Sequence, residues 1–376
     1  MEKQKRNNLI AGVAVVAIIV LVIALSGNNA QAETIKIGAV YPLSGPLSSY
    51  GTEYKRGLEM AAEEINSNGG INGKKVELIF EDDQGRPKKS TTAVKKLINV
   101  NNVDYLFTAF SSTSKATAPI AQENKVLYIS ATVSRIGDQG KYIFRDFWDI
   151  NTQGAAIGNA MEKEGMEKVG IIAMRYGDTE AFLDDVKREA ENVTFVDQRF
   201  DRGTKDFRTQ LTKIKDANVD GILVYAFPGS TAIQITEQIK ELGLDDKRLF
   251  AGATTYAVPF MYNQFSETLE KMGAIDTGYS LEESNEKAMN FTEKYEKRYN
   301  TSLIGDAAYP YDDLYALKEA IEDAGNSENT TKVANELKDV EMMGAAGKLE
   351  FDENGNSQRP AYLQQYTKDG WERYNL

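Results

Sequence analysis

Hydroxyl and aromatic side chains gather in short segments that directly follow apolar runs of the chain. Residues 41–51 (YPLSGPLSSYG), 109–114 (AFSSTS) and 131–135 (ATVSR) each lead from such a run into a stretch with helical periodicity. Tyr176-Gly177 and Phe227-Pro228-Gly229 hold similar positions later in the chain. The free N–H groups at the start of a helix favour a carboxylate or another anion, to which hydroxyls can also hydrogen-bond. One serine or threonine alone is more often a helix cap, but their convergence on one face predicts a ligand site.

Most catalytic chemistry is excluded by composition. The 376 residues contain no cysteine and no histidine, which removes disulfides, thiolate nucleophiles, imidazole bases and the usual zinc or copper sites. No glycine-rich phosphate loop is present, and Leu363 stands where the calcium-like segment that begins at Asp352 would need a glutamate. We therefore expect no enzyme, no cofactor and no metal, although carboxylate-only catalysis stays open. The net charge of −12 argues against nucleic acid as a partner.

The N-terminus has the features of an export signal. Lys3, Lys5 and Arg6 precede an unbroken apolar run over residues 9–25, and Ala30-Gln31-Ala32 follows as a small-x-small cleavage pattern. The apolar run is longer than the usual core of a signal peptide and at the short limit for a membrane span. Residues 1–32 are therefore expected to be a signal peptide or an N-terminal membrane anchor, and the rest of the protein to be exported, periplasmic or at the cell surface.

The elements that must position the hydroxyl and aromatic segments alternate between strand and helix. This βαβα rhythm runs from residue 35 to 130 and restarts at 168, so two doubly wound α/β domains in tandem are predicted. The tail follows a different pattern: helices are expected at 283–299, 312–324 and 331–338, and strands at 347–352 and 361–366 around a turn at Asn354-Gly355. A tail that continues neither rhythm indicates that the chain crosses back to complete both domains.

Eight short motifs then carry a resemblance to a known family, and they occur in order over residues 33–376. They are 44–51 (SGPLSSYG), 63–74 (EEINSNGGINGK), 81–85 (EDDQG), 111–113 (SST), 127–130 (LYIS), 176–177 (YG), 311–312 (YD) and 350–355 (EFDENG). With them the chain resembles the leucine/isoleucine/valine-type (type I) solute-binding proteins of ABC transporters. The resemblance implies two Rossmann-like lobes, joined by three crossovers, that close on a ligand in the cleft between them. The expected boundaries are 33–150 plus 278–343 for lobe 1 and 151–277 plus 344–376 for lobe 2.

The resemblance also implies site residues. Ser111 would hold the α-carboxylate of an amino acid beside Phe110, Ser134 would add a hydroxyl, and Thr132 would offer its carbonyl to the ammonium. The aromatic walls of the pocket would be Tyr50 from one lobe and Tyr176 and Phe227 from the other. Thr254 stands where the family has the acid that pairs with the ammonium, and Asp306 where it usually has an aromatic residue.

Asp306 therefore has three interpretations. It could pair with a ligand ammonium, it could meet a basic side chain such as Arg145 or Arg175, or it could cap the helix that follows it. The function expected from the resemblance is capture of a small solute, an amino acid of the branched-chain type first, by a monomer that closes on it and delivers it to an ABC permease. A sensory ectodomain and a binder of another small carboxylate or amide solute are the alternatives.

Overall fold

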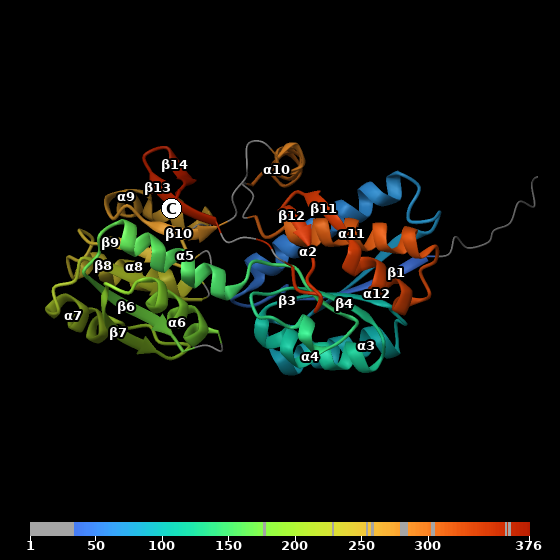
Figure 1. Cartoon of the computed structure of the whole chain (residues 1–376), viewed down its shortest axis with the longest axis horizontal. Helices are drawn as coiled ribbons and strands as arrows, with labels where there is room; N and C mark the ends of the chain where they lie inside the picture. The colour runs from blue at the N-terminus through green and yellow to red at the C-terminus, as the bar shows by residue number, and fades with distance from the viewer. Residues whose placement is uncertain are drawn as a thin grey trace, which may run out of the picture.

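The computed structural model describes residues 34–175, 178–227, 229–252, 255–256, 259–278, 285–301, 305–357, 359 and 362–376. These residues form two α/β lobes that lie side by side, each built around its own sheet (Figure 1). Within these ranges, no helix is both long enough and apolar enough to cross a membrane. The expected leader, residues 1–32, lies outside the described residues.

The first lobe is a parallel sheet of five strands in the order β2-β1-β3-β4-β5. Helices α2, α11 and α12 pack together on one face, and α3 and α4 pack together on the other (Figure 1). The strands are β1 (Thr34–Tyr41), β2 (Lys75–Asp82), β3 (Tyr105–Ala109), β4 (Leu127–Ala131) and β5 (Ile143–Arg145). The helices are α2 (Ser48–Ser67), α3 (Pro87–Asn99), α4 (Ser111–Glu123), the 3-10 turn η1 (Gly137–Gln139), α10 (Glu286–Tyr299), α11 (Ala308–Ala324) and α12 (Thr330–Asp339).

The second lobe is a sheet of seven strands in the order β14-β13-β10-β9-β8-β6-β7, in which only β13 and β14 run antiparallel to their neighbours. Successive residues of its strands face opposite sides, so Ile171 packs in one hydrophobic cluster and Ile172 in the other. The strands are β6 (Lys168–Met174), β7 (Thr194–Phe200), β8 (Gly221–Tyr225), β9 (Arg248–Ala251), β10 (Ile275–Gly278), β13 (Tyr362–Thr367) and β14 (Gly370–Arg373). The helices are α5 (Ile150–Lys163), α6 (Thr179–Glu189), α7 (Arg208–Asp216), α8 (Gly229–Glu241) and α9 (Pro259–Lys271).

The chain passes between the sheets three times: after β5, after β10, and before β13. The last passage comes later than the sequence indicated. Strand β12 (Gly347–Glu350) pairs with β11 (Glu341–Gly344) beside α11, and Asn356 bridges to Arg145, the last residue of β5, so residues 344–357 lie with the first lobe and not the second (Figure 1). The two expected strands of the tail therefore do not pair with each other, although the turn between them forms, closed by a hydrogen bond from the Gly355 N–H to the Asp352 carbonyl.

Local sequence explains where the elements around the first sheet begin and end. Helix α2 ends at Ser67 because Gly69 and Gly70 follow with φ of 99° and 78°, a backbone that favours glycine. A Cβ at Gly70 would also lie 2.0 Å from the carbonyl oxygen of Lys74. This tight turn returns the chain into β2, whose last residue, Asp82, accepts hydrogen bonds from the N–H groups of Leu43 and Ser44 and fixes the loop that follows β1.

Candidate functional site

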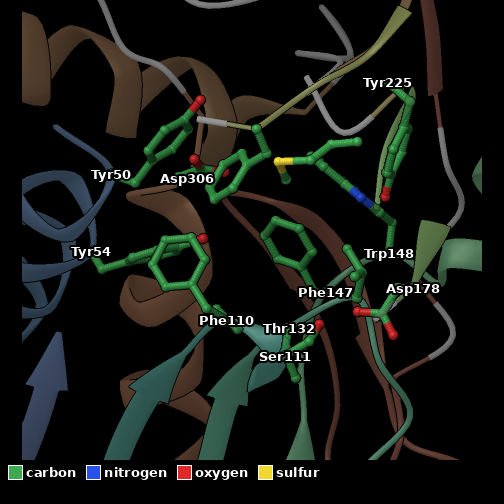
Figure 2. Close-up of a pocket in the computed structure, with 14 residues that line it drawn as sticks. Tyr50, Tyr54, Phe110, Ser111, Thr132, Phe147, Trp148, Asp178, Tyr225 and Asp306 are labelled. Atoms are coloured by element: carbon green, nitrogen blue, oxygen red, sulfur yellow. The ribbon is translucent and has the colours of Figure 1, made fainter. Parts of the chain in front are cut away.

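A cavity opens between the lobes at the carboxyl ends of the strands, with about 680 Å³ of space that no atom fills, part of it open to solvent. Both lobes contribute to its wall (Figure 2). Its lining residues are Tyr50, Tyr54, Phe110, Ser111, Ala131, Thr132, Val133, Phe147, Trp148, Met174, Asp178, Tyr225, Phe227 and Asp306. Aromatic side chains dominate this set, and the few polar groups among them can orient a bound molecule.

The first two turns of α2 carry two tyrosines into the cavity. Gly51 allows the first turn to pack against the preceding loop, because a Cβ there would lie 2.2 Å from the Pro42 carbonyl oxygen. Tyr50 and Tyr54 lie on the buried side of the helix, before and after Gly51, and their ring centroids are 6.3 and 5.8 Å from that of Phe110. One side of the cavity is thus a continuous aromatic surface from the first lobe.

The hydroxyls of the cavity come from two neighbouring strand ends. Phe110 joins β3 to α4 with φ of 69° and ψ of 137°, an uncommon backbone for a residue with a side chain, and strain of this kind often accompanies a functional site. The turn places Ser111 at the start of α4, where its Oγ lies 3.0 Å from Thr132 Oγ1 at the end of β4. Figure 2 shows the two side chains together at one end of the cavity. Two hydroxyls at a helix N-terminus form a suitable cradle for a carboxylate.

Phe227 closes the cavity from the second lobe. Its ring lies 5.2 Å from that of Tyr50 and 5.8 Å from that of Phe110, so three rings from two lobes meet across the cleft. Further along the wall, Phe147 and Trp148 pack on each other with centroids 4.2 Å apart. The interior between these rings is a setting for an apolar group.

Asp178 is the polar residue that connects the lobes at the cavity. It precedes α6 in the second lobe but makes no side-chain cap to that helix. Its Oδ1 instead accepts hydrogen bonds from Ser134 Oγ at 2.7 Å and Lys115 Nζ at 3.0 Å, both from the first lobe. Only 6% of Asp178 is exposed. These contacts require the two lobes to be close together.

Asp306 lies on another side of the cavity, near Tyr50 and Tyr54 (Figure 2). Burial, reinforced by the charge of Glu53, raises the pKa of its carboxyl to about 8, so the group is protonated at neutral pH. Helix α11 starts with Ala307 as N-cap and without a side-chain cap, so the capping interpretation of Asp306 is wrong.

The two arginines considered as partners of Asp306 are engaged elsewhere. Arg145 is buried and donates to the carbonyls of Phe147 and Ser357. Arg175 is half exposed and pairs with Asp201 at 3.2 Å. The structure therefore gives no support to pairing of either one with Asp306.

The structure brings six of the residues named from the sequence together around the cavity: Tyr50, Phe110, Ser111, Thr132, Phe227 and Asp306. Ser134 does not line the cavity and contacts it through Asp178. Tyr176 and Thr254 lie outside the described residues. Sequence reasoning missed the residues of the first crossover and the second lobe that complete the wall, namely Phe147, Trp148, Met174, Asp178 and Tyr225, as well as Tyr54 on α2. Asp178 directly follows the Tyr176-Gly177 motif, which was the signal that could have pointed to it.

Across the part of the chain that the structure describes, no group of three or more acidic side chains is placed to hold a metal ion. Besides the hydroxyls of the tyrosines and the indole of Trp148, the polar groups of the described lining are two hydroxyls, of Ser111 and Thr132, and two carboxyls, of Asp178 and Asp306, from four separate segments. This arrangement can bind and orient a small molecule, and it contains no paired nucleophile and base.

Comparisons with known proteins agree with this geometry. Residues 34–371 match the family described as periplasmic binding protein. A curated relative is the leucine-, isoleucine-, valine-, threonine-, and alanine-binding protein of Pseudomonas aeruginosa, 27% identical over 336 residues that cover 86% of this chain and 87% of the relative. Two solved structures are similar throughout. The leucine-binding protein LivK of Thermotoga maritima has a TM-score of 0.82 at 25% identity, covering 91% of this chain and 98% of its own. LivJ of Streptococcus pneumoniae, solved with isoleucine, has a TM-score of 0.80 at 24% identity, and the match covers 90% of this chain and 98% of LivJ. The chain thus belongs to the periplasmic binding protein family.

Proposed function

We propose that this protein captures an apolar α-amino acid, of the branched-chain type first, and delivers it to an ABC permease in the membrane. The observation that carries the proposal is one cavity that combines a carboxylate cradle at the start of α4 with an aromatic interior drawn from both lobes. Two relatives support the same ligand class: the protein of Pseudomonas aeruginosa binds leucine, isoleucine, valine, threonine and alanine, and that of Thermotoga maritima binds leucine.

The carboxylate would lie on Ser111 and Thr132. A hydrogen bond from a hydroxyl to a charged acceptor contributes about 1.5–3 kcal/mol, and the positive end of a helix adds to it. Both side chains are buried, so this interaction would be formed away from bulk water, where it is stronger. The apolar side chain of the ligand would then extend toward Phe147 and Trp148 or toward the ring cluster of Tyr50, Phe110 and Phe227.

Capture would couple to closure of the lobes, because the walls come from both of them. A ligand that contacts both lobes gains its full set of contacts only in the closed form, so it shifts the population toward that form, which the permease recognises. We infer that this takes place on the outer side of the cytoplasmic membrane, with residues 9–25 acting as the export signal or as the anchor that holds the protein there.

The test is a thermal-shift screen of the twenty amino acids and a set of carboxylates without an ammonium group, followed by calorimetry on the hits. A binder present at a hundredfold excess over its Kd stabilises the folded state by about 2.7 kcal/mol. We expect leucine, isoleucine or valine to raise the Tm, and no turnover of the bound molecule. A protein that responds only to carboxylates or amides without an ammonium refutes the amino-acid assignment.

A further inference from the structure

We propose that Asp178 is the group that recognises the ammonium of the ligand, and that it links this recognition to lobe closure. The inference rests on the proposed function, because it assumes a ligand with a carboxylate and an ammonium. It assigns the ammonium-pairing role neither to Asp306 nor to the region of Thr254, the two positions that the sequence had raised.

The first observation is an incompletely satisfied carboxylate that faces the cavity. Oδ1 of Asp178 accepts from Ser134 and Lys115, whereas Oδ2 is buried and has no hydrogen-bond partner among the described residues. A buried carboxylate oxygen without a donor is costly, so a site of this kind gains from a ligand that supplies one. An ammonium offers both the donor and the opposite charge.

The second observation is the position of Asp178 relative to the carboxylate cradle. Thr132 Oγ1 accepts from the Ser134 N–H at 3.3 Å, and the Ser134 hydroxyl in turn donates to Asp178. One residue therefore connects the hydroxyl that would hold the ligand carboxylate to the acid that would hold the ammonium. An α-amino acid carries both groups on one carbon, so their partners must be neighbours, and Figure 2 shows Asp178 beside Thr132 and Ser111.

Asp306 does not meet this requirement. Figure 2 places it on the opposite side of the cavity from Asp178, among the tyrosines of α2. Its burial favours a neutral carboxyl, which can hydrogen-bond but does not offer an ammonium a full opposite charge. The geometry thus separates two acids with different roles: Asp178 for the charged end of the ligand, Asp306 for the apolar side of the cavity.

The third observation connects ligand charge to closure. Asp178 belongs to the second lobe, while Ser134 and Lys115 belong to the first, so the ligand ammonium and the two protein donors would meet on one carboxylate only when the lobes are together. The Lys115 side chain is 47% exposed, which leaves it free to adjust as a ligand enters. A ligand without an ammonium would leave Asp178 Oδ2 unpaired and would place its own carboxylate near a negative charge.

The experiment is a crossed affinity comparison, using leucine and its deaminated counterpart 4-methylpentanoate on wild type, Asp178→Asn and Asp306→Asn. We expect Asp178→Asn to weaken the binding of leucine by about 30-fold or more, because the charge-assisted hydrogen bond between carboxylate and ammonium is lost. The same variant should bind 4-methylpentanoate more tightly than wild type, since the repulsion between two carboxylates is gone. Asp306→Asn should change the affinities for leucine and 4-methylpentanoate by the same factor, because the ammonium that distinguishes the two probes lies on the other side of the cavity.

Control variants and fold checks keep the result interpretable. Asp201→Asn removes an exposed acid of the same lobe that pairs with Arg175 away from the cavity, and it should bind both probes as wild type does. The Tm of each variant without ligand establishes that it is folded. If Asp178→Asn does not fold, Ser134→Ala serves as a second variant, because it removes a donor that holds the Asp178 carboxylate. A loss of affinity for leucine that is no greater than the loss for 4-methylpentanoate would count against the proposal.

The outcomes separate this inference from the proposed function. A wild-type protein that binds no amino acid refutes both. A wild-type protein that binds leucine, together with an Asp178→Asn variant that binds it equally well, refutes only the inference. A loss confined to Asp306→Asn would assign the ammonium to that residue instead.

Discussion

Asp306→Asn should change how the stability of the protein depends on pH. The carboxyl is buried, and its pKa rises from 3.8 to about 8 in the folded state. Between these two values the folded protein holds a proton that the unfolded chain has released, so the free energy of unfolding falls as the pH rises. The contribution of this group to stability is fully present below the unfolded pKa and is lost as the pH rises through the folded one.

The size of the effect follows from the pKa difference. Each pH unit inside this window costs about 1.36 kcal/mol, so wild type should lose about 2.7 kcal/mol between pH 5 and pH 7 through this group alone. Asparagine has nearly the same size and no titrating group, so the variant should lack that part of the loss. Asp312 titrates in the same range, with a pKa raised by burial to about 6, so the difference between the two proteins is the quantity to measure.

The assay is urea unfolding of wild type and Asp306→Asn without ligand at pH 5, 6, 7 and 8. We expect the free energy of unfolding of the variant, relative to that of wild type, to rise by up to about 2.7 kcal/mol from pH 5 to pH 7. This difference should level off above pH 8. Asp201→Asn removes an exposed acid, so its free energy of unfolding should depend on pH as that of wild type does. Parallel curves for Asp306→Asn as well would show that water reaches the carboxyl and that the group is not neutral.

Three further substitutions test the cleft and the crossovers. Ser111→Ala removes a hydroxyl from the carboxylate cradle and should cost about 1.5–3 kcal/mol of leucine affinity by calorimetry, whereas an unchanged Kd would remove it from the site. Phe227→Ala deletes the ring that meets Tyr50 across the cleft, so it should weaken binding and leave the Tm without ligand nearly unchanged; the reverse result would make it a core residue. Arg359→Met leaves the buried carboxylate of Asp146 without its partner and should lower stability by about 3–5 kcal/mol, and a Tm close to that of wild type would contradict this.

The alternation of apolar runs and amphipathic stretches was enough to predict the fold. The apolar run at residues 35–40 lies within β1 (Thr34–Tyr41), and the amphipathic stretch at 52–66 lies within α2, which begins four residues before that stretch. These elements are determined by periodicity and by local stop signals such as Gly69-Gly70, which act over a few residues and can be found without knowing the tertiary structure. Two lobes of this architecture follow from the same pattern.

The passage of the tail from one lobe to the other could not be located in this way. Alternation predicts that 347–352 is a strand, but it does not say which strand it pairs with. Its partner β11 is only a few residues upstream, and Asp312 on α11 accepts from the N–H groups of Ala345 and Ala346 in the turn between them. That contact joins residues more than 30 positions apart in the sequence, and it holds β12 with the first lobe.

The site residues that belong to a local motif could be predicted from the sequence. Those placed by contacts between distant parts of the chain could not. Ser111 and Thr132 follow strands and precede helix or loop starts, which the sequence displays directly. Ser134 was expected to contact a ligand, but its hydroxyl donates to an acid 44 residues away. Trp148 carries no local signal at all, because it lines the cavity only through the path of the first crossover.

The buried charges at the crossovers indicate where the molecule can bend. Arg145 before the first passage exchanges backbone hydrogen bonds with Gly355 and Ser357 before the third, and its guanidinium donates to the Ser357 carbonyl. Arg359 donates to both carboxylate oxygens of Asp146.

These interactions attach both passages to the first lobe up to Phe147 and Arg359. Breaking a buried ion pair costs about 3–5 kcal/mol, as much as or more than the few kcal/mol that separate two conformations of one protein. Trp148 also packs on Tyr309 of α11, and Asp149 pairs with Arg135, so the first crossover stays attached to the first lobe as far as Asp149 and its bend is expected where α5 begins. A ligand that packs on Phe147 and Trp148 would contact the crossover directly before this bend, which would link binding to hinge motion.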